Sequence, residues 1–187
     1  MQHHTAPRIK SVDPDRMTPA QRAAAAVVAA GPRGSVRGPF AVLLNSPGTF
    51  AAAQGLGAYL RFESPIPANL RELAILATAR HWRQDYEWTV HAALAATAGV
   101  STRAIAALAA GAEPMDLTPH EALVLQFCDQ LNRSGNVDDA TYAQVESVLD
   151  TEGVIDLCAV CGYYALLAMV MNVARNPLPA TPSPFAD

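Results

Sequence analysis

Charged and aromatic side chains are scarce in this sequence. Of its 187 residues, 16% are charged and 6% are aromatic, whereas 51% are hydrophobic. So apolar a composition excludes intrinsic disorder and favours a single soluble domain with a sizeable core. It also leaves little polar surface, so we expect part of the apolar surface to be buried between the subunits of a homo-oligomer.

Clusters of basic residues are also lacking. The 13 Lys and Arg residues are scattered along the chain, and the net charge is -4. A nucleic-acid-binding protein needs a basic stripe on its surface. We therefore expect no nucleic-acid partner and look for a small-molecule ligand.

Cysteine is too rare for a disulfide framework. The three cysteines are an odd number, and Cys158-x-x-Cys161 lies inside a long apolar run. Buried cysteines in such a run usually act as small hydrophobic side chains, and we interpret Cys128 in the same way. No His–Cys pair has the spacing of metal ligands, so we expect no metal and no redox role for these thiols.

An apolar leader is absent as well, and one segment approaches the length of a membrane span. The first residues contain acids and prolines, so we expect no signal peptide. Residues 154–174 are nearly uncharged, but they include Asp156 and Asn172 and lack a basic flank. A helix that is apolar all round is equally typical of a buried central helix. We expect a buried helix, no membrane partner and a cytoplasmic location.

Helix start and stop signals dominate the chain. No stretch alternates with a period of two, so we expect no sheet and an all-α fold. Capping residues followed by proline open helices, and glycine or proline closes them. Besides a short helical turn at 40–44, we expect about eight helices, counted from their caps: 18–30, 46–62, 68–81, 85–98, 101–110, 118–132, 138–149 and 151–175.

Composition also suggests where the domain begins and ends. Residues 1–17 read as an extended arm that contains proline, and residues 177–187 as a Pro-rich tail. We expect a single helical domain over residues 18–176. The arm and the tail carry no recognisable chemistry.

Three ionisable residues are expected to meet between the two central helices. Helices over 68–81 and 85–98 should form an antiparallel hairpin about a turn near residues 82–84. Glu72 lies roughly ten residues before that turn and His91 roughly eight after it, so at ~1.5 Å per residue they fall within roughly 3 Å of the same height. Glu87 precedes His91 by one helical turn, on the same face.

This set suits acid–base chemistry, but each member also has an ordinary structural explanation. Glu72 could complement the dipole of its own helix, and Glu87 with His91 could be a surface pair. Arg80, which returns to a face similar to that of Glu72, could be a helix-end charge. Their clustering in the most apolar hairpin favours a site, because unpaired charges there would be costly. Composition and spacing alone indicate no more than an acid–base site.

The run over residues 70–111 carries a resemblance. Its R-E-L-A-I-L, Y-E-W-x-x-H and A-G-V-S pieces resemble the core motif of the carboxymuconolactone decarboxylase family, which includes the AhpD-like proteins. Gly162, Tyr163, Tyr164 and Asn172 also suit that family. The resemblance implies an AhpD-like helical bundle with a central antiparallel hairpin, assembled as a trimer or hexamer.

The peroxidase branch of this family needs thiols that the motif lacks. In that branch a Glu is followed by C-x-x-C-x-x-x-H. Glu72 and His91 match its Glu and His, but the two cysteine positions hold Gln84 and Glu87. Without a thiolate there is no nucleophile for a hydroperoxide and no disulfide to cycle.

The decarboxylase branch fits better. It implies a lyase without a cofactor that removes carbon dioxide from a small carboxylated lactone or related acid. We hypothesise that His91 is the general acid/base, that Glu87 orients it and that Glu72 assists the proton relay. A cation would bind the substrate carboxylate, and other side chains would wall the pocket, although Trp88 could instead pack in the core. The residues expected to contact substrate are Arg80, His81, Gln84, Tyr86 and Trp88.

Two alternatives come from other classes of protein. One is a thiol-dependent antioxidant protein, and the other is a non-catalytic homologue that only binds a small ligand. The environment of Gln84 and Glu87 separates catalysis from mere binding. If both side chains point into a closed apolar pocket with His91, catalysis is favoured, and if they point to water, a binding or scaffold role is favoured.

Overall fold

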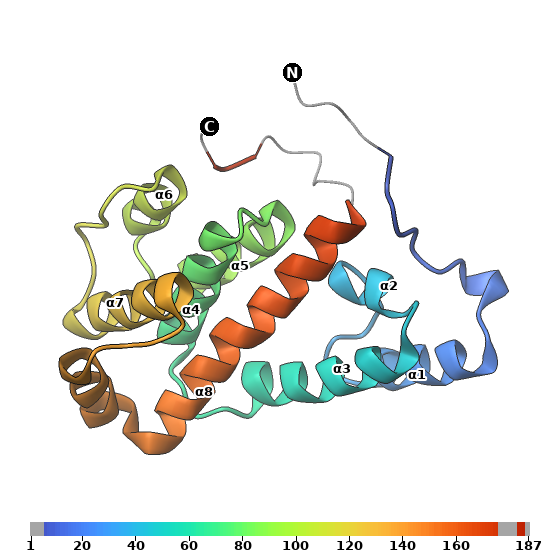
Figure 1. Ribbon diagram of the computed structural model, residues 1–187, viewed down its shortest axis with the longest axis horizontal. Helices are drawn as coiled ribbons and strands as arrows, with labels where there is room; N and C mark the ends of the chain where they lie inside the picture. The colour runs from blue at the N-terminus through green and yellow to red at the C-terminus, as the bar shows by residue number, and fades with distance from the viewer. Residues whose placement is uncertain (1–5, 176–182, 186–187) are drawn as a thin grey trace. The chain divides into compact units, whose positions relative to one another are not determined.

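Helices alone build the part of the chain that the computed structural model describes, residues 6–175 and 183–185 (Figure 1). The all-α prediction is confirmed. The expected arm (1–17) and tail (177–187) lie partly outside these residues. The elements are η1 (Pro14–Arg16), α1 (Pro19–Ala30), α2 (Pro39–Leu43), α3 (Pro47–Phe62), α4 (Ala68–His81), α5 (Asp85–Thr97), α6 (Thr102–Ala110), α7 (Pro119–Ser134) and α8 (Asp139–Ala174).

The predicted start signals act as helix caps. At both Thr18 and Thr118 the hydroxyl accepts the backbone N–H of the third helical residue, and that residue's side chain, Gln21 or Glu121, accepts the threonine N–H. Each capping box satisfies donors that a helix start leaves without a partner in the helix. These helix starts were therefore predictable from residues adjacent in sequence.

The break expected near residue 150 lies inside α8. Asp150 has φ 57° and ψ -177°, which is not helical, and its carboxylate accepts the N–H of Gly153 at 3.0 Å. A non-glycine residue in this conformation is strained, and the hydrogen bond offsets part of that cost because it caps the next turn. The two helices expected on either side of the break are therefore confirmed, and the range labelled α8 comprises both of them, with the kink at Asp150 between them.

Helix α8 is also the one helix among the described residues that is long and apolar enough to cross a membrane. About half of its most apolar window, 56%, is buried inside the structure. The core helix of a globular protein meets the same criteria of length and composition, so this is weak evidence for a span.

The described chain divides into two compact units, and α8 contributes to both. The first unit comprises Met1–Glu63 and Leu166–Pro177. In it α3 packs against α1 and α2. Phe40 and Phe50 meet edge to face with ring centroids 5.5 Å apart, and the guanidinium of Arg33 lies over the Phe40 ring.

The second unit comprises Ser64–Ala165 and Leu178–Asp187, and it contains the predicted hairpin. Helix α4 lies at its centre and packs against α5, α6 and α7 (Figure 1). The apolar core around α4 includes Leu73, Leu76, Ala79, Trp88, Ala95, Val100, Ala104, Ile105 and Phe185. This dense packing leaves α4 with little solvent contact, so any charged side chain on its inner face has to find a partner in the protein.

Candidate acid–base site

The turn between α4 and α5 fixes how the two helices face each other. The N–H of Gln84 donates to the carbonyl of Ala79 at 2.9 Å, and Arg83 adopts a positive φ of 49°. The Gln84 side chain then accepts the N–H of Tyr86 at 3.0 Å and caps α5. The hairpin turns where the sequence predicted, near residues 82–84, and this brings the two helices back alongside each other.

Three ionisable side chains meet inside this hairpin. Nδ1 of His91 lies 2.6 Å from Oε2 of Glu72, and Nε2 lies 3.5 Å from Oε2 of Glu87. The exposed fractions of the three residues are 2%, 5% and 3% in the order His91, Glu72, Glu87. The height match predicted from the helical rise is thus confirmed by a direct hydrogen bond between α4 and α5.

This geometry determines where protons lie. An ionised carboxylate can only accept a hydrogen bond, so the short contact assigns a proton on Nδ1 to the side of Glu72. A bare lone pair on Nε2 would face the Glu87 carboxylate across 3.5 Å. That arrangement is repulsive, so we infer that a proton lies on Nε2 or on Glu87. These three side chains, called the trio below, can therefore share a second proton between His91 and Glu87, besides the one in the contact with Glu72.

One aromatic ring from α8 packs beside the imidazole, and a second packs behind the first. The ring of Tyr164 meets His91 edge to face, with centroids 5.0 Å apart and an interplanar angle of 85°. Tyr163 packs against Tyr164 in the same way at 5.2 Å. Both tyrosines are buried. The sequence pointed to them only through the family resemblance, because they lie about 70 residues beyond His91.

The structural explanations offered for the acids do not hold. Glu72 is the fifth residue of α4, and the first turn of that helix contains no acid. It is therefore too far from the helix start for the dipole explanation. The pair of Glu87 and His91 is not on the surface, since their side chains are 4% and 3% exposed.

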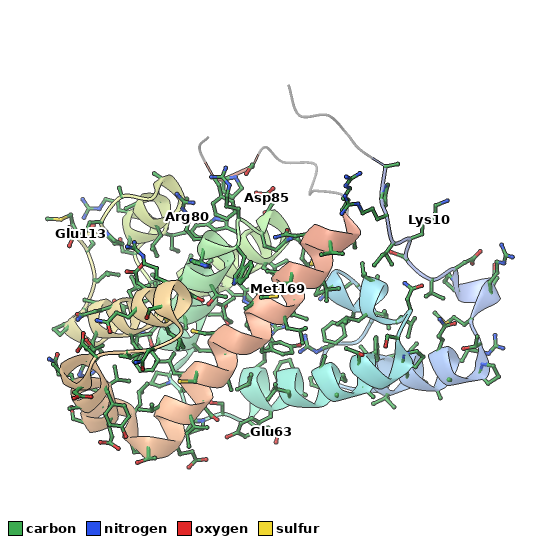
Figure 2. The ribbon with its side chains drawn as sticks, in the orientation of Figure 1. Lys10, Glu63, Arg80, Asp85, Glu113 and Met169 are labelled. Carbon is green, nitrogen blue, oxygen red and sulfur yellow. The ribbon has the colours of Figure 1, made fainter. Side chains whose placement is uncertain are left out.

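Arg80 does not contact the three ionisable side chains in any described interaction. Its Nε donates to the carbonyl of Leu108 at the end of α6 at 3.1 Å, and its guanidinium lies over the Phe185 ring at 5.4 Å. In Figure 2 it lies on the side of the hairpin that faces α6. The convergence of Arg80 on the acids was therefore a wrong expectation, because α6 and the tail take up its hydrogen-bonding face. A role for Arg80 in substrate binding stays a prediction.

The other residues expected to contact substrate differ in how exposed they are. His81 ends α4, is exposed and meets Trp82 edge to face at 5.5 Å. Trp88 is a core residue, 4% exposed, with its ring 5.2 Å from that of Phe185. Tyr86 is half-buried near the start of α5.

Gln84 and Glu87 occupy the positions where the peroxidase pattern would place cysteines. Both are buried. Only Glu87 faces His91 among the contacts described, whereas the Gln84 side chain caps α5. Within residues 6–175 and 183–185, no three His, Cys, Asp or Glu side chains are arranged to hold a metal ion.

The tail contacts the hairpin at a point the sequence did not indicate. The hydroxyl of Ser183 donates to Asp85 at 2.6 Å, and Phe185 is 3% exposed between Trp88 and Arg80. These contacts anchor the described part of the tail to the turn of the hairpin. A lone phenylalanine after several prolines has no periodic pattern that could have predicted this.

Comparisons with known proteins agree with this architecture. Residues 47–130 match the model of the Carboxymuconolactone decarboxylase family. A crystal structure described as the alkylhydroperoxidase AhpD core, an uncharacterized peroxidase-related protein from Ralstonia eutropha JMP134, has the same fold. It superposes with a TM-score of 0.75 at 18% identity, over 95% of this chain and 94% of that one. No curated protein matches the sequence.

Proposed function

From the match of residues 47–130 to the model of the carboxymuconolactone decarboxylase family, we propose that the protein is a member of this family and a lyase without a cofactor. Its substrate would be a small carboxylated lactone or a related acid, from which it releases carbon dioxide. The observation that supports this is the His91 imidazole held between the carboxylates of Glu72 and Glu87 in a buried hairpin.

The proposed reaction needs only a proton donor and a substrate that delocalises electrons. Loss of carbon dioxide breaks a carbon–carbon bond, and its electron pair spreads over the substrate as an enolate. Nε2 of His91 then gives a proton to carbon, so that carboxylate and proton become carbon dioxide and the protonated product. A low-dielectric surrounding favours this step, since it removes the hydration that stabilises the carboxylate.

The distances support different parts for the two acids. Glu72, at 2.6 Å, orients the imidazole and stabilises its charged form, as a carboxylate does behind a catalytic histidine. Glu87, at 3.5 Å from Nε2, returns a proton to His91 after each turnover. The sequence-based hypothesis gave orientation to Glu87; the shorter contact favours Glu72 for that part.

The proposed function also needs a cation that binds the substrate carboxylate. Arg80 would have to give up its contacts with Leu108 and Phe185 to reach the trio, and His81 faces solvent. From the sequence we also propose that the chain assembles as a homo-oligomer, either a trimer or a hexamer, and that it is located in the cytoplasm.

The alternative of a thiol peroxidase has less support. The similar structure is described as peroxidase-related, but positions 84 and 87 of this chain are Gln and Glu. Neither residue can attack a hydroperoxide or form a disulfide. A non-catalytic protein that binds a small ligand is the second alternative, and the experiment below separates the three.

The test is a panel of small carboxylated lactones and related acids, screened by thermal shift and then for carbon dioxide release. We expect at least one compound to be decarboxylated and His91→Gln to lower kcat by about 100-fold or more, as for loss of a general acid. The matched control is His120→Gln, which changes an exposed histidine in the first turn of α7 and should keep full activity.

Each other result points to one alternative. Compounds that raise the melting temperature without releasing carbon dioxide would identify a binding protein. Consumption of a hydroperoxide with a dithiol, and no lyase activity, would identify a peroxidase whose thiols lie outside positions 84 and 87. Full turnover by a folded His91→Gln protein would remove His91 from the mechanism.

A further inference from the structure

Two cysteines that are far apart in sequence touch inside the second unit. Sγ of Cys128 on α7 lies 3.6 Å from Sγ of Cys161 on α8, 33 positions later in the sequence. Cys128 is fully buried and Cys161 is 3% exposed. We propose that Cys128 and Cys161 are a redox-active pair that closes to a disulfide between α7 and α8.

The geometry singles out this pair among the three thiols. Cys158 is exposed one helical turn before Cys161 on the same helix. Positions i and i+3 of a helix have Cβ atoms roughly 5–6 Å apart. A disulfide needs about 3.5–4.5 Å. Joining Cys158 to Cys161 would therefore distort α8, whereas Cys128 and Cys161 already meet from two different helices.

The surroundings of the pair favour one thiol as the nucleophile. A hydrogen bond with Cys128 lowers the pKa of Cys161, and a further hydrogen bond from Thr78 on α4 acts in the same direction. The same contact with Cys161, together with burial, raises the pKa of Cys128 well above its usual value. Neighbouring atoms that shield the Cys158 sulfur from part of the solvent also raise its pKa, although the residue is exposed. Of the two thiols in contact, Cys161 is therefore the one whose pKa is shifted towards the thiolate, although its burial opposes the shift.

The step balances with hydrogen peroxide as oxidant. The Cys161 thiolate attacks one peroxide oxygen, which breaks the O–O bond and leaves a sulfenic acid on Cys161 and one water after proton uptake. The sulfur of Cys128 then displaces the sulfenic oxygen as a second water and forms the S–S bond. Two thiols lose two electrons in total, and one peroxide is reduced to two waters.

This pair is independent of the proposed lyase. It lies on α7 and α8, and neither cysteine contacts Glu72, Glu87 or His91 in any described hydrogen bond or ion pair. The sequence analysis interpreted both thiols as packing residues. Nothing in the Cys158-x-x-Cys161 spacing indicates that Cys161 contacts Cys128 on α7.

The experiment maps disulfides in the full chain. Reduced protein is treated with a few equivalents of hydrogen peroxide, blocked with a thiol reagent in denaturant and digested without reduction. We expect two thiols per chain to disappear and one cross-linked peptide to join Cys128 to Cys161. Because the disulfide closes a loop of about 30 residues, the melting temperature should rise by roughly 5–10 °C and fall again with dithiothreitol.

Variants make the assignment specific. Cys158→Ser should keep both the cross-link and the thermal shift, whereas Cys128→Ala should lose both. The mapping of the wild-type chain decides the question even where Cys128→Ala folds poorly. A link between Cys158 and Cys161, a link between two chains, or three thiols still free after peroxide treatment would each overturn the proposal.

Discussion

Two regions of the second unit bury glutamate, and they treat it in opposite ways. At the start of α7, the carboxylate of Glu121 accepts the Asn69 amide at 3.0 Å and both the N–H and the hydroxyl of Thr118 at 2.9 and 3.0 Å. Between α4 and α5, Glu72 and Glu87 face a single imidazole from opposite sides. A cap surrounds its acid with neutral donors, whereas the hairpin makes two acids share one titratable partner.

The difference teaches how to tell a structural acid from a chemical one. Burial raises the pKa of Glu121, but hydrogen bonds from Asn69 and Thr118 outweigh it, so its pKa lies below the usual value. Such an acid stays ionised and moves no protons at neutral pH. In the trio, by contrast, both carboxylates face an imidazole that can itself gain or lose a proton, so a proton can move between partners.

Removing the shared partner should have the largest effect. His91→Leu leaves the carboxylates of Glu72 and Glu87 buried without the cation or donor between them, which we expect to cost about 3 kcal/mol of unfolding free energy at pH 7. The cost should shrink at pH 5, because protonation of the stranded acids relieves it. Urea denaturation at both pH values measures this.

His120→Leu is the matched control for that prediction, since residue 120 is exposed, and it should change stability by less than about 0.5 kcal/mol. A His91→Leu protein as stable as the wild type would show that the trio is not a coupled unit. The proposed difference between Glu121 and the acids that contact His91 would then be wrong.

Removing the charge of the cap should have a smaller effect with a defined dependence on pH. Glu121→Gln keeps the shape but loses the ionised acceptor, and we expect a loss of about 1–2 kcal/mol at pH 7. A carboxyl whose folded pKa is depressed stabilises the protein above its unfolded pKa, roughly 4.3, and loses that contribution as pH falls through the folded value. The difference in unfolding free energy between Glu121→Gln and the wild type should therefore become smaller below about pH 4.

Glu113→Gln changes an exposed acid and serves as the control in the same titration. If the difference in unfolding free energy between Glu121→Gln and the wild type stayed constant down to about pH 3, the hydrogen bonds, and not the ionised form, would account for the stability of the cap.

The smallest effect should come from Gln84. It is buried like Glu87, yet its described contact is a cap of α5 through the Tyr86 N–H. Gln84→Ala should cost about 0.5–1 kcal/mol of stability, and Gln84→Asp should restore most of it. Any lyase activity found should keep its KM within about twofold in Gln84→Asp. A KM that rises tenfold in a fully stable Gln84→Asp protein would return Gln84 to the substrate site.

Much of this could be predicted from sequence because the signals are local. The capping boxes at Thr18 and Thr118 involve residues three positions apart, and the observed bounds of α4 are those expected. The meeting of Glu72 and His91 also followed from local geometry, because a short turn and a fixed rise per residue leave two antiparallel helices few ways to align.

Other features depended on neighbours that no local pattern reveals. Arg80 returns to a face near that of Glu72 by periodicity, but α6 and Phe185 offer its guanidinium a carbonyl and a ring. The contact between Cys128 and Cys161 joins two helices 33 positions apart. The sequence by itself determined the helices, the hairpin and the pairing of His91 with its acids. Only the tertiary structure decided where long side chains point and which thiols meet, since those choices depend on packing between distant segments.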